Sequence, residues 1–131
     1  MAYKPIKGNW KKNKVYDFGW AFQNPLIPVC MKGKKEGIFP TGSHSFCQLD
    51  QPNVLVLTLK QAEDKDGLIV RLVEMEGKNS KVTVKLPFIL IKRAYQTNLV
   101  EENERLLSAQ KHEVRVPVKA FGIATVRIKG S

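Results

Sequence analysis

The fold is decided by residues 54–75, which read VLVLTLK (54–60), QAEDKDG (61–67) and LIVRLVEM (68–75). Two apolar runs rich in β-branched residues flank a polar segment that ends in Asp-Gly, a pattern typical of a β-hairpin. Asp64 and Gly67 suit a tight turn that is closed by a glycine with positive φ. Both faces of the hairpin are apolar. We therefore predict two central strands that are covered on both sides.

The turn also predicts a register for the two strands. If Asp64 lies opposite Gly67, then Lys60 lies opposite Arg71. Two like charges that face each other within a strand pair repel, so a carboxylate must lie close to them. Glu74 and Glu63 are the obvious candidates in the sequence. The sequence thus predicts a structural charge network made by four residues: Lys60, Arg71, Glu74 and Glu63.

Most of the remaining chain also has β patterns. Further strands are predicted at residues 15–22, 26–31, 45–49, 82–86, 114–118 and 124–128, with a loop at 32–45. A helix is predicted at 99–110, because Asn98 and Glu101 have the spacing of a capping box, although a long loop fits as well. Seven or eight short strands separated by turns predict an all-β fold, an antiparallel β-sandwich or barrel, with at most one short helix.

The size of the chain, 131 residues, suits a single domain with a real core. We predict one domain over residues 1–131, in which residues 1–14 form an extended N-terminal segment. The formal net charge is +10, and the lysines gather in two groups, at residues 4–14 and 32–35. A basic surface of this kind is either solvated or meets an acidic partner.

One alternative interpretation follows from the charge alone. A free-standing basic β-sandwich could bind an anionic polymer, either a nucleic acid or an acidic glycan. No RRM, KH, zinc-finger or helix-turn-helix signature accompanies the lysines, and the aromatic residues form no stacking platform. We therefore do not expect nucleic acid to be the partner.

Membrane and redox features are sparse. No apolar run is long enough to span a bilayer, so we expect no membrane partner. The N-terminus shows no apolar signal-peptide region, which weakly favours a cytoplasmic location. Cys30 and Cys47 are the only cysteines, and their spacing indicates two ordinary thiols, with a disulfide or a metal role as the alternative.

Catalytic chemistry is not visible in the residues. His44 lies between Ser43 and Ser45, but no nucleophile-elbow motif accompanies it. Three carboxylates, at residues 63, 64 and 66, share one turn, where solvated acids are common. Paired carboxylates can also hydrolyse glycosidic bonds. We predict no catalytic, cofactor-binding or metal-ligating residue in this chain.

Short motifs along most of the chain resemble one family. In order, they are Pro5, Gly8 and Trp10; Ala21-Phe22, Asn24-Pro25-Leu26; Ser45-Phe46; Pro52-Asn53-Val54; Leu59-Lys60; Ala62-Glu63-Asp64; Gly67, Arg71 and Glu74; Ala94; Thr97-Asn98-Leu99; Glu101-Glu102; and Phe121, Ile123, Thr125 and Arg127. Their order resembles the C-terminal β-sandwich region of family 38 glycoside hydrolases, the α-mannosidases. Two positions depart from the pattern: Gly122 replaces an acid, and Val73 stands where an aromatic residue is common.

This resemblance implies an accessory role in carbohydrate metabolism. It implies the C-terminal part of a longer retaining α-mannosidase, whose zinc site and catalytic aspartate belong to preceding domains. The partner would be the catalytic domain of the same polypeptide, and mannose-containing carbohydrate would be met through the parent enzyme. The domain would pack on the catalytic domain and shape the sugar site. Trp10 would pack on the sandwich, with Trp20 in or near its core.

Overall fold

The computed structural model describes residues 3–30, 33 and 42–131. The chain divides into two compact units, Met1–Ser43 and His44–Ser131. One helix is described in the first unit, α1 (Val15–Gln23), and the second unit holds nine strands. These are β1 (Gln48–Leu49), β2 (Val54–Gln61), β3 (Leu68–Glu74), β4 (Ser80–Lys85), β5 (Ile91–Thr97), β6 (Asn103–Leu107), β7 (Ala109–Gln110), β8 (Glu113–Val118) and β9 (Ile123–Gly130).

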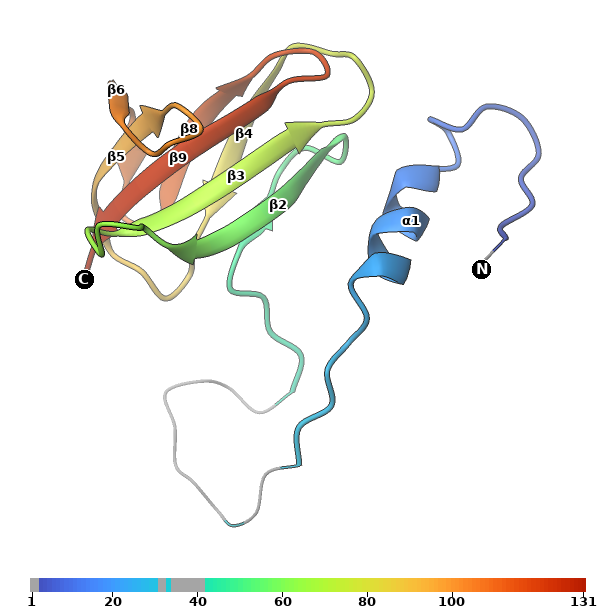
Figure 1. Cartoon of the computed structure of the whole chain (residues 1–131), viewed down its shortest axis with the longest axis horizontal. Helices are drawn as coiled ribbons and strands as arrows, with labels where there is room; N and C mark the ends of the chain where they lie inside the picture. The colour runs from blue at the N-terminus through green and yellow to red at the C-terminus, as the bar shows by residue number, and fades with distance from the viewer. Residues whose placement is uncertain (1–2, 31–32, 34–41) are drawn as a thin grey trace. The chain divides into compact units, whose positions relative to one another are not determined.

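The nine strands form two antiparallel sheets that face each other (Figure 1). One sheet has the order β1-β4-β8-β7, and the other has the order β2-β3-β9-β5-β6. The predicted antiparallel β-sandwich is therefore confirmed. The paired strands are joined in part by hairpins, and the central position of β9 between β3 and β5 brings the end of the chain into the middle of the larger sheet.

The core lies between the inner faces of the two sheets. Strand alternation sends every second residue inward, and the predicted half-exposed strands at 82–86 and 114–118 follow it as β4 and β8. The buried cluster includes Val70, Leu72, Val82, Val84, Leu86, Val114, Val116, Val118, Ala124, Val126 and Ile128. Most members are β-branched, because such side chains fit a pleated, two-sided packing layer.

The hairpin of β2 and β3 is present, but its predicted register is wrong. Lys60 lies opposite Ile69, and Arg71 lies opposite Thr58. The longer connection produces the two-residue difference at Lys60, since the Ala62 N–H donates to the Gly67 carbonyl across it. A bulge between Val56 and Thr58 shifts the pairing of residues 54–56 by one further residue.

The position of β2 also differs from the prediction. Strand β3 is central, as expected, but β2 is an edge strand of the five-stranded sheet, and Leu59 on it is 43% exposed. An apolar sequence indicates that both faces of a strand are covered by other residues. It does not indicate whether a neighbouring strand pairs with each of its two edges.

The first unit contradicts two predicted strands. Residues 15–22 lie in helix α1 rather than in a strand, and residues 26–30 form no strand, while residue 31 lies outside the described residues. Aromatic residues alternate from Tyr16 to Phe22, which imitates a strand. A strand needs a partner for its backbone groups, whereas a helix satisfies them locally, as the Asn24 N–H does with the Trp20 carbonyl at 3.0 Å.

Two further predictions concern the chain between helix α1 and the sandwich, a loop and a strand. The loop predicted at 32–45 lies largely outside the described residues. The strand predicted at 45–49 is shorter than expected and contains only β1.

Among the described residues, no helix is sufficiently long and apolar to cross a membrane. The expected contacts of Trp10 and Trp20 with the sandwich stay predictions.

The segment 99–110 is neither a helix nor a long loop. It contains strands β6 and β7. Asn98 does not cap a helix, because its Oδ1 accepts the N–H groups of Val100 at 3.1 Å and Glu102 at 2.9 Å in a tight turn. The adjacent leucines then alternate as strand residues, with Leu107 in the core and Leu106 64% exposed.

Candidate functional site: the outer face of the five-stranded sheet

The five-stranded sheet has an outer face that points away from the core. On β3 and β9 the residues of this face alternate with the core residues and are Ile69, Arg71, Val73, Ile123, Thr125 and Arg127. Ile69 is fully buried, and Thr125 and Arg127 are 3% and 5% exposed. Residues on an outer face reach such burial only under a covering segment.

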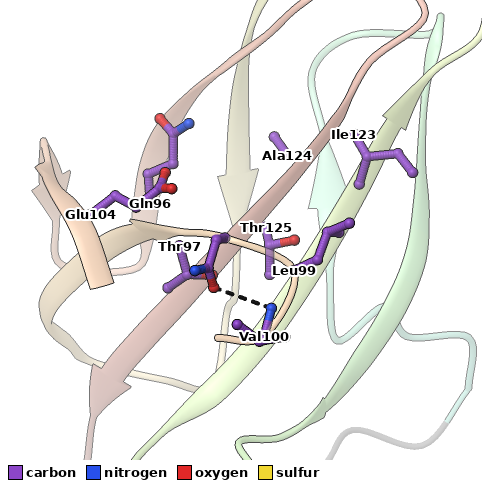
Figure 2. Close-up of a pocket in the computed structure, with 9 residues that line it drawn as sticks. Gln96, Thr97, Leu99, Val100, Glu104, Ile123, Ala124 and Thr125 are labelled. Carbon is purple, nitrogen blue, oxygen red and sulfur yellow. Dashed lines mark hydrogen bonds between the residues drawn. The ribbon is translucent and has the colours of Figure 1, made fainter. Parts of the chain in front are cut away.

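The covering segment is the loop of residues 98–102, which joins β5 to β6 and crosses in front of β9 (Figure 2). Its ends are closed by one side chain, since the Asn98 amide also donates to the Glu102 carboxylate at 2.7 Å. Two arginines of the sheet hold its backbone. Arg71 donates to the Leu99 carbonyl at 3.1 Å, and Arg127 donates to the Glu101 carbonyl at 2.9 Å.

Glu101 anchors the loop toward β2. Its side chain is 6% exposed and lies 2.9 Å from the ammonium group of Lys60. The other carboxylate oxygen accepts the Glu63 N–H at 2.9 Å. This N–H and the Lys60 side chain lower the pKa of Glu101, so the carboxylate is charged at neutral pH and holds both partners.

Arg127 also fixes the turn between β2 and β3. Its Nη1 donates to both carboxylate oxygens of Asp64, at 2.7 and 2.6 Å, and to the Asp66 carbonyl at 3.0 Å. The Asp66 N–H, followed by the Arg127 guanidinium, lowers the pKa of Asp64. The Nε of Arg127 is buried without a hydrogen-bond partner. The loop, the turn and the sheet are thus joined through one buried guanidinium.

The four residues of the predicted charge network are divided among three places. Lys60 pairs with Glu63, as the prediction named, and also with Glu101. These two carboxylates raise the pKa of Lys60. Arg71 donates to the Thr125 hydroxyl at 3.3 Å and to the Leu99 carbonyl, and it does not face Lys60. The two-residue difference in register separates the predicted partners.

Glu74 lies apart from this network, 1% exposed, at the end of β3. Its carboxylate accepts four hydrogen bonds of 2.7–2.8 Å, from the backbone N–H groups of Glu76, Gly77 and Phe121 and from the side-chain amide of Asn53. Burial raises the pKa of a carboxyl group, but these donors outweigh it and lower the pKa of Glu74 from 4.5 to about 2. Glu74 therefore joins two turns by accepting their backbone N–H groups.

A shallow depression of about 490 Å³ opens beside the loop (Figure 2). Its wall combines apolar side chains with two threonines, and its lining includes Thr97, Leu99, Val100, Glu104, Ile123 and Thr125. Leu99 and Val100 are 62% and 75% exposed, and Ile123 is 53% exposed. The loop thus presents two exposed apolar side chains, Leu99 and Val100, beside the exposed Glu102.

The two histidines and the two cysteines are the remaining residues that could carry chemistry. The His44 ring lies 4.7 Å from the Phe88 ring, and the Nδ1 of His112 is 2.8 Å from the Ile89 carbonyl oxygen. Cys30 and Cys47 are free thiols, and burial raises the pKa of Cys47. Within residues 3–30, 33 and 42–131, no group of three His, Cys, Asp or Glu side chains has the arrangement of a metal site.

The anchor on β2 gives a first testable prediction. Lys60→Met is expected to lower the urea midpoint of the sandwich, because it leaves the nearly buried Glu101 carboxylate without its cation. The effect should be smaller than a loss from the core, since the Lys60 side chain is 34% exposed. Glu63→Gln is the matched control, because the Glu63 side chain is 81% exposed. Equal midpoints for all three proteins would contradict the anchoring role.

Comparison with known protein families identifies the family of this sandwich. Residues 53–126 match the family described as the glycosyl hydrolases family 38 C-terminal beta sandwich domain. The match covers more than half of the chain and runs from just before β2 into β9. The chain belongs to this family. A comparison with curated proteins finds no match.

Family membership confirms the resemblance seen in the sequence and gives its motifs a structural meaning. The family 38 motif Ala62-Glu63-Asp64 supplies the turn that Arg127 fixes, and the motif Glu101-Glu102 supplies the anchor of the 98–102 loop. Both motifs lie inside the matched region. In this family 38 domain the motif carboxylates hold loops in place.

The sequence analysis did not find the polar partners that hold the outer face together, which are Asp64, Glu101 and Arg127. It also did not find Asn53, which donates to Glu74 in the separate network at the end of β3. A signal for Arg127 was present: it lies in the alternating run 124–128, at a position between two buried residues. Its depth could not be inferred, because the 98–102 loop was not expected to cross the sheet.

Proposed function

We propose that this family 38 sandwich is the accessory domain of an α-mannosidase-like retaining glycoside hydrolase. In this proposal it packs on the catalytic domain and shapes the outer wall of the carbohydrate site. The observation that carries the proposal is the family match, because the matched family is by description a C-terminal domain of glycosyl hydrolases. A C-terminal domain has a preceding domain as its natural partner.

The chemistry of the described residues is consistent with an accessory role. The carboxylates that share the β2–β3 turn are taken up by structural pairs: Glu63 with Lys60, Asp64 with Arg127, and Asp66 with Lys129. Retaining glycosidases need two carboxyl groups about 5–5.5 Å apart across the bond that is cleaved. In the proposal, those groups and the zinc site belong to the catalytic domain, and carbohydrate is met only through it.

The test starts from the gene. The complete reading frame is expected to continue upstream into a catalytic domain with an Asp/His metal cluster. The purified parent enzyme should hydrolyse aryl α-mannosides, and removal of the sandwich should reduce kcat/KM. The 131-residue chain alone should show no turnover above buffer, with or without zinc.

Two results would contradict the proposal. The first is a stand-alone gene of this length. The second is turnover by the isolated chain that is lost on mutation of this chain. A parent enzyme that cleaves a different glycosidic bond would keep the accessory role and remove the α-mannosidase assignment.

A further inference from the structure

If the sandwich is an accessory domain, as proposed above, one of its surfaces must contact the catalytic domain. We propose that the loop of residues 98–102, together with Ile123 beside it, is the docking surface for the catalytic domain of the parent enzyme. The partner surface would be an apolar concavity with a lysine or arginine at its rim.

Holding the 98–102 loop in place has a cost in free energy. Two charged groups are nearly buried to fix it, Glu101 at 6% and Arg127 at 5% exposure. Burying charges is expensive even when they are paired. The loop that these charged groups hold exposes Leu99 and Val100, which are 62% and 75% exposed. A rigid apolar surface has little use in water, but it lowers the entropy cost of binding a partner.

The exposed apolar residues of the loop and of β9 are neighbours. Leu99, Val100 and Ile123 line the same depression, and Figure 2 shows Leu99 on the same side of β9 as Ile123. The outer residues of the adjoining strands, Val73 and Leu55, are half-buried and continue the apolar row, because they pair in register with Ile123 and Val73. Exposed apolar residues that are neighbours on a surface are typical of interaction sites.

The charges beside the loop indicate the chemistry of the partner. A hollow of about 400 Å³ next to Val100 is lined by five carboxylates, from Glu63, Asp64, Asp66, Glu101 and Glu102. Three cations lie on or near it, Lys60, Arg127 and Lys129, each already paired. The hollow therefore has an acidic excess in a chain whose net charge is +10. An arginine or lysine of the partner would fit there.

The experiment is hydroxyl-radical footprinting of two proteins, the 131-residue chain and the intact parent enzyme. In the parent, Leu99 and Val100 should lose most of the oxidation that they show in the chain alone. Leu90 is the matched control, because it is 47% exposed and lies outside the outer face, and its oxidation should not change. The double variant Leu99→Asp/Val100→Asp in the parent should restore oxidation at Ile123 and make the junction between the domains sensitive to protease. Leu90→Asp should do neither.

Each outcome decides one point. Urea unfolding of the 131-residue double variant should match the wild type, because both side chains are exposed, which separates docking from folding. Protection of another face of the sandwich would overturn this inference and leave the proposed function intact. Protection of no face in the parent would overturn both. Concentration-dependent protection of Leu99 in the isolated chain would identify a second copy as the occupant and also overturn the inference.

Discussion

Glu74→Gln is expected to lower the free energy of unfolding of the sandwich by about 3 kcal/mol, because hydrogen bonds to a buried charged group contribute about 1.5–3 kcal/mol each and unsatisfied buried donors are costly. The new amide keeps one acceptor oxygen, and its NH2 group replaces the other oxygen and therefore faces two of the four donors. These two are either the Gly77 and Phe121 N–H groups or the Glu76 N–H and the Asn53 amide. Urea unfolding followed by circular dichroism measures the loss.

The effect of Glu74 should also depend on pH. Its pKa is about 2 in the folded protein and 4.5 as the ordinary value. A depressed carboxyl pKa stabilises the fold fully above the ordinary value, and this stabilisation is lost as the pH falls through the folded value. The difference between wild type and Glu74→Gln should therefore shrink between pH 4.5 and about 2.

The control for Glu74 is an exposed carboxylate. Glu113→Gln removes the charge of a side chain that is 50% exposed and 3.7 Å from Lys85. It should change the free energy of unfolding by no more than about 0.5 kcal/mol, as exposed pairs commonly do. A Glu74→Gln protein as stable as Glu113→Gln at neutral pH would show that the four donors are satisfied without a carboxylate.

Gly67→Ala is expected to destabilise the sandwich by about 3 kcal/mol, since a strained backbone costs about 1–3 kcal/mol and a clash adds to it. Gly67 has φ +101°, and a Cβ at this position would lie 2.5 Å from the carbonyl oxygen of Ile128 on β9. That oxygen belongs to the backbone of a central strand, so it cannot move aside cheaply. The same urea titration measures the change.

A substitution in the same turn should act in the opposite direction. Lys65 has φ +62°, a conformation that glycine adopts without steric cost. Lys65→Gly is therefore expected to leave the stability unchanged or to raise it. If Gly67→Ala unfolded at the same urea concentration as the wild type, the close approach of the β2–β3 turn to β9 would be wrong.

Short-range chemistry predicted much of the fold. The alternation of Val82, Val84 and Val114 with polar residues predicted β4 and β8, because one face of each strand must be apolar to join a core. The Asp-Gly dipeptide before Leu68 predicted the hairpin. The polar composition of the turns predicted where strands end. These signals are local, so no knowledge of the packing was needed.

The strand predicted at 15–22 and the helix predicted at 99–110 are wrong for the same physical reason: a local pattern does not show which partners the backbone will have. The residues from Tyr16 to Phe22 have a period of two, yet helix α1 forms, since the pattern does not say whether a partner strand is available. Asn98 has a side chain that can accept backbone N–H groups in a helix cap or in a tight turn. The choice depended on the pairing of β6 with β5.

The sequence by itself determined that this protein is an antiparallel β-sandwich of family 38 type, because alternation, turn residues and ordered motifs are written along the chain. Only the tertiary structure decided the register of Lys60, the edge position of β2 and the covering of the outer face by residues 98–102. Each of these depends on groups far apart in the chain, such as Arg127 and Asp64. A buried guanidinium group binds the acceptors that the fold brings close to it, and no local sequence pattern encodes which acceptors these are.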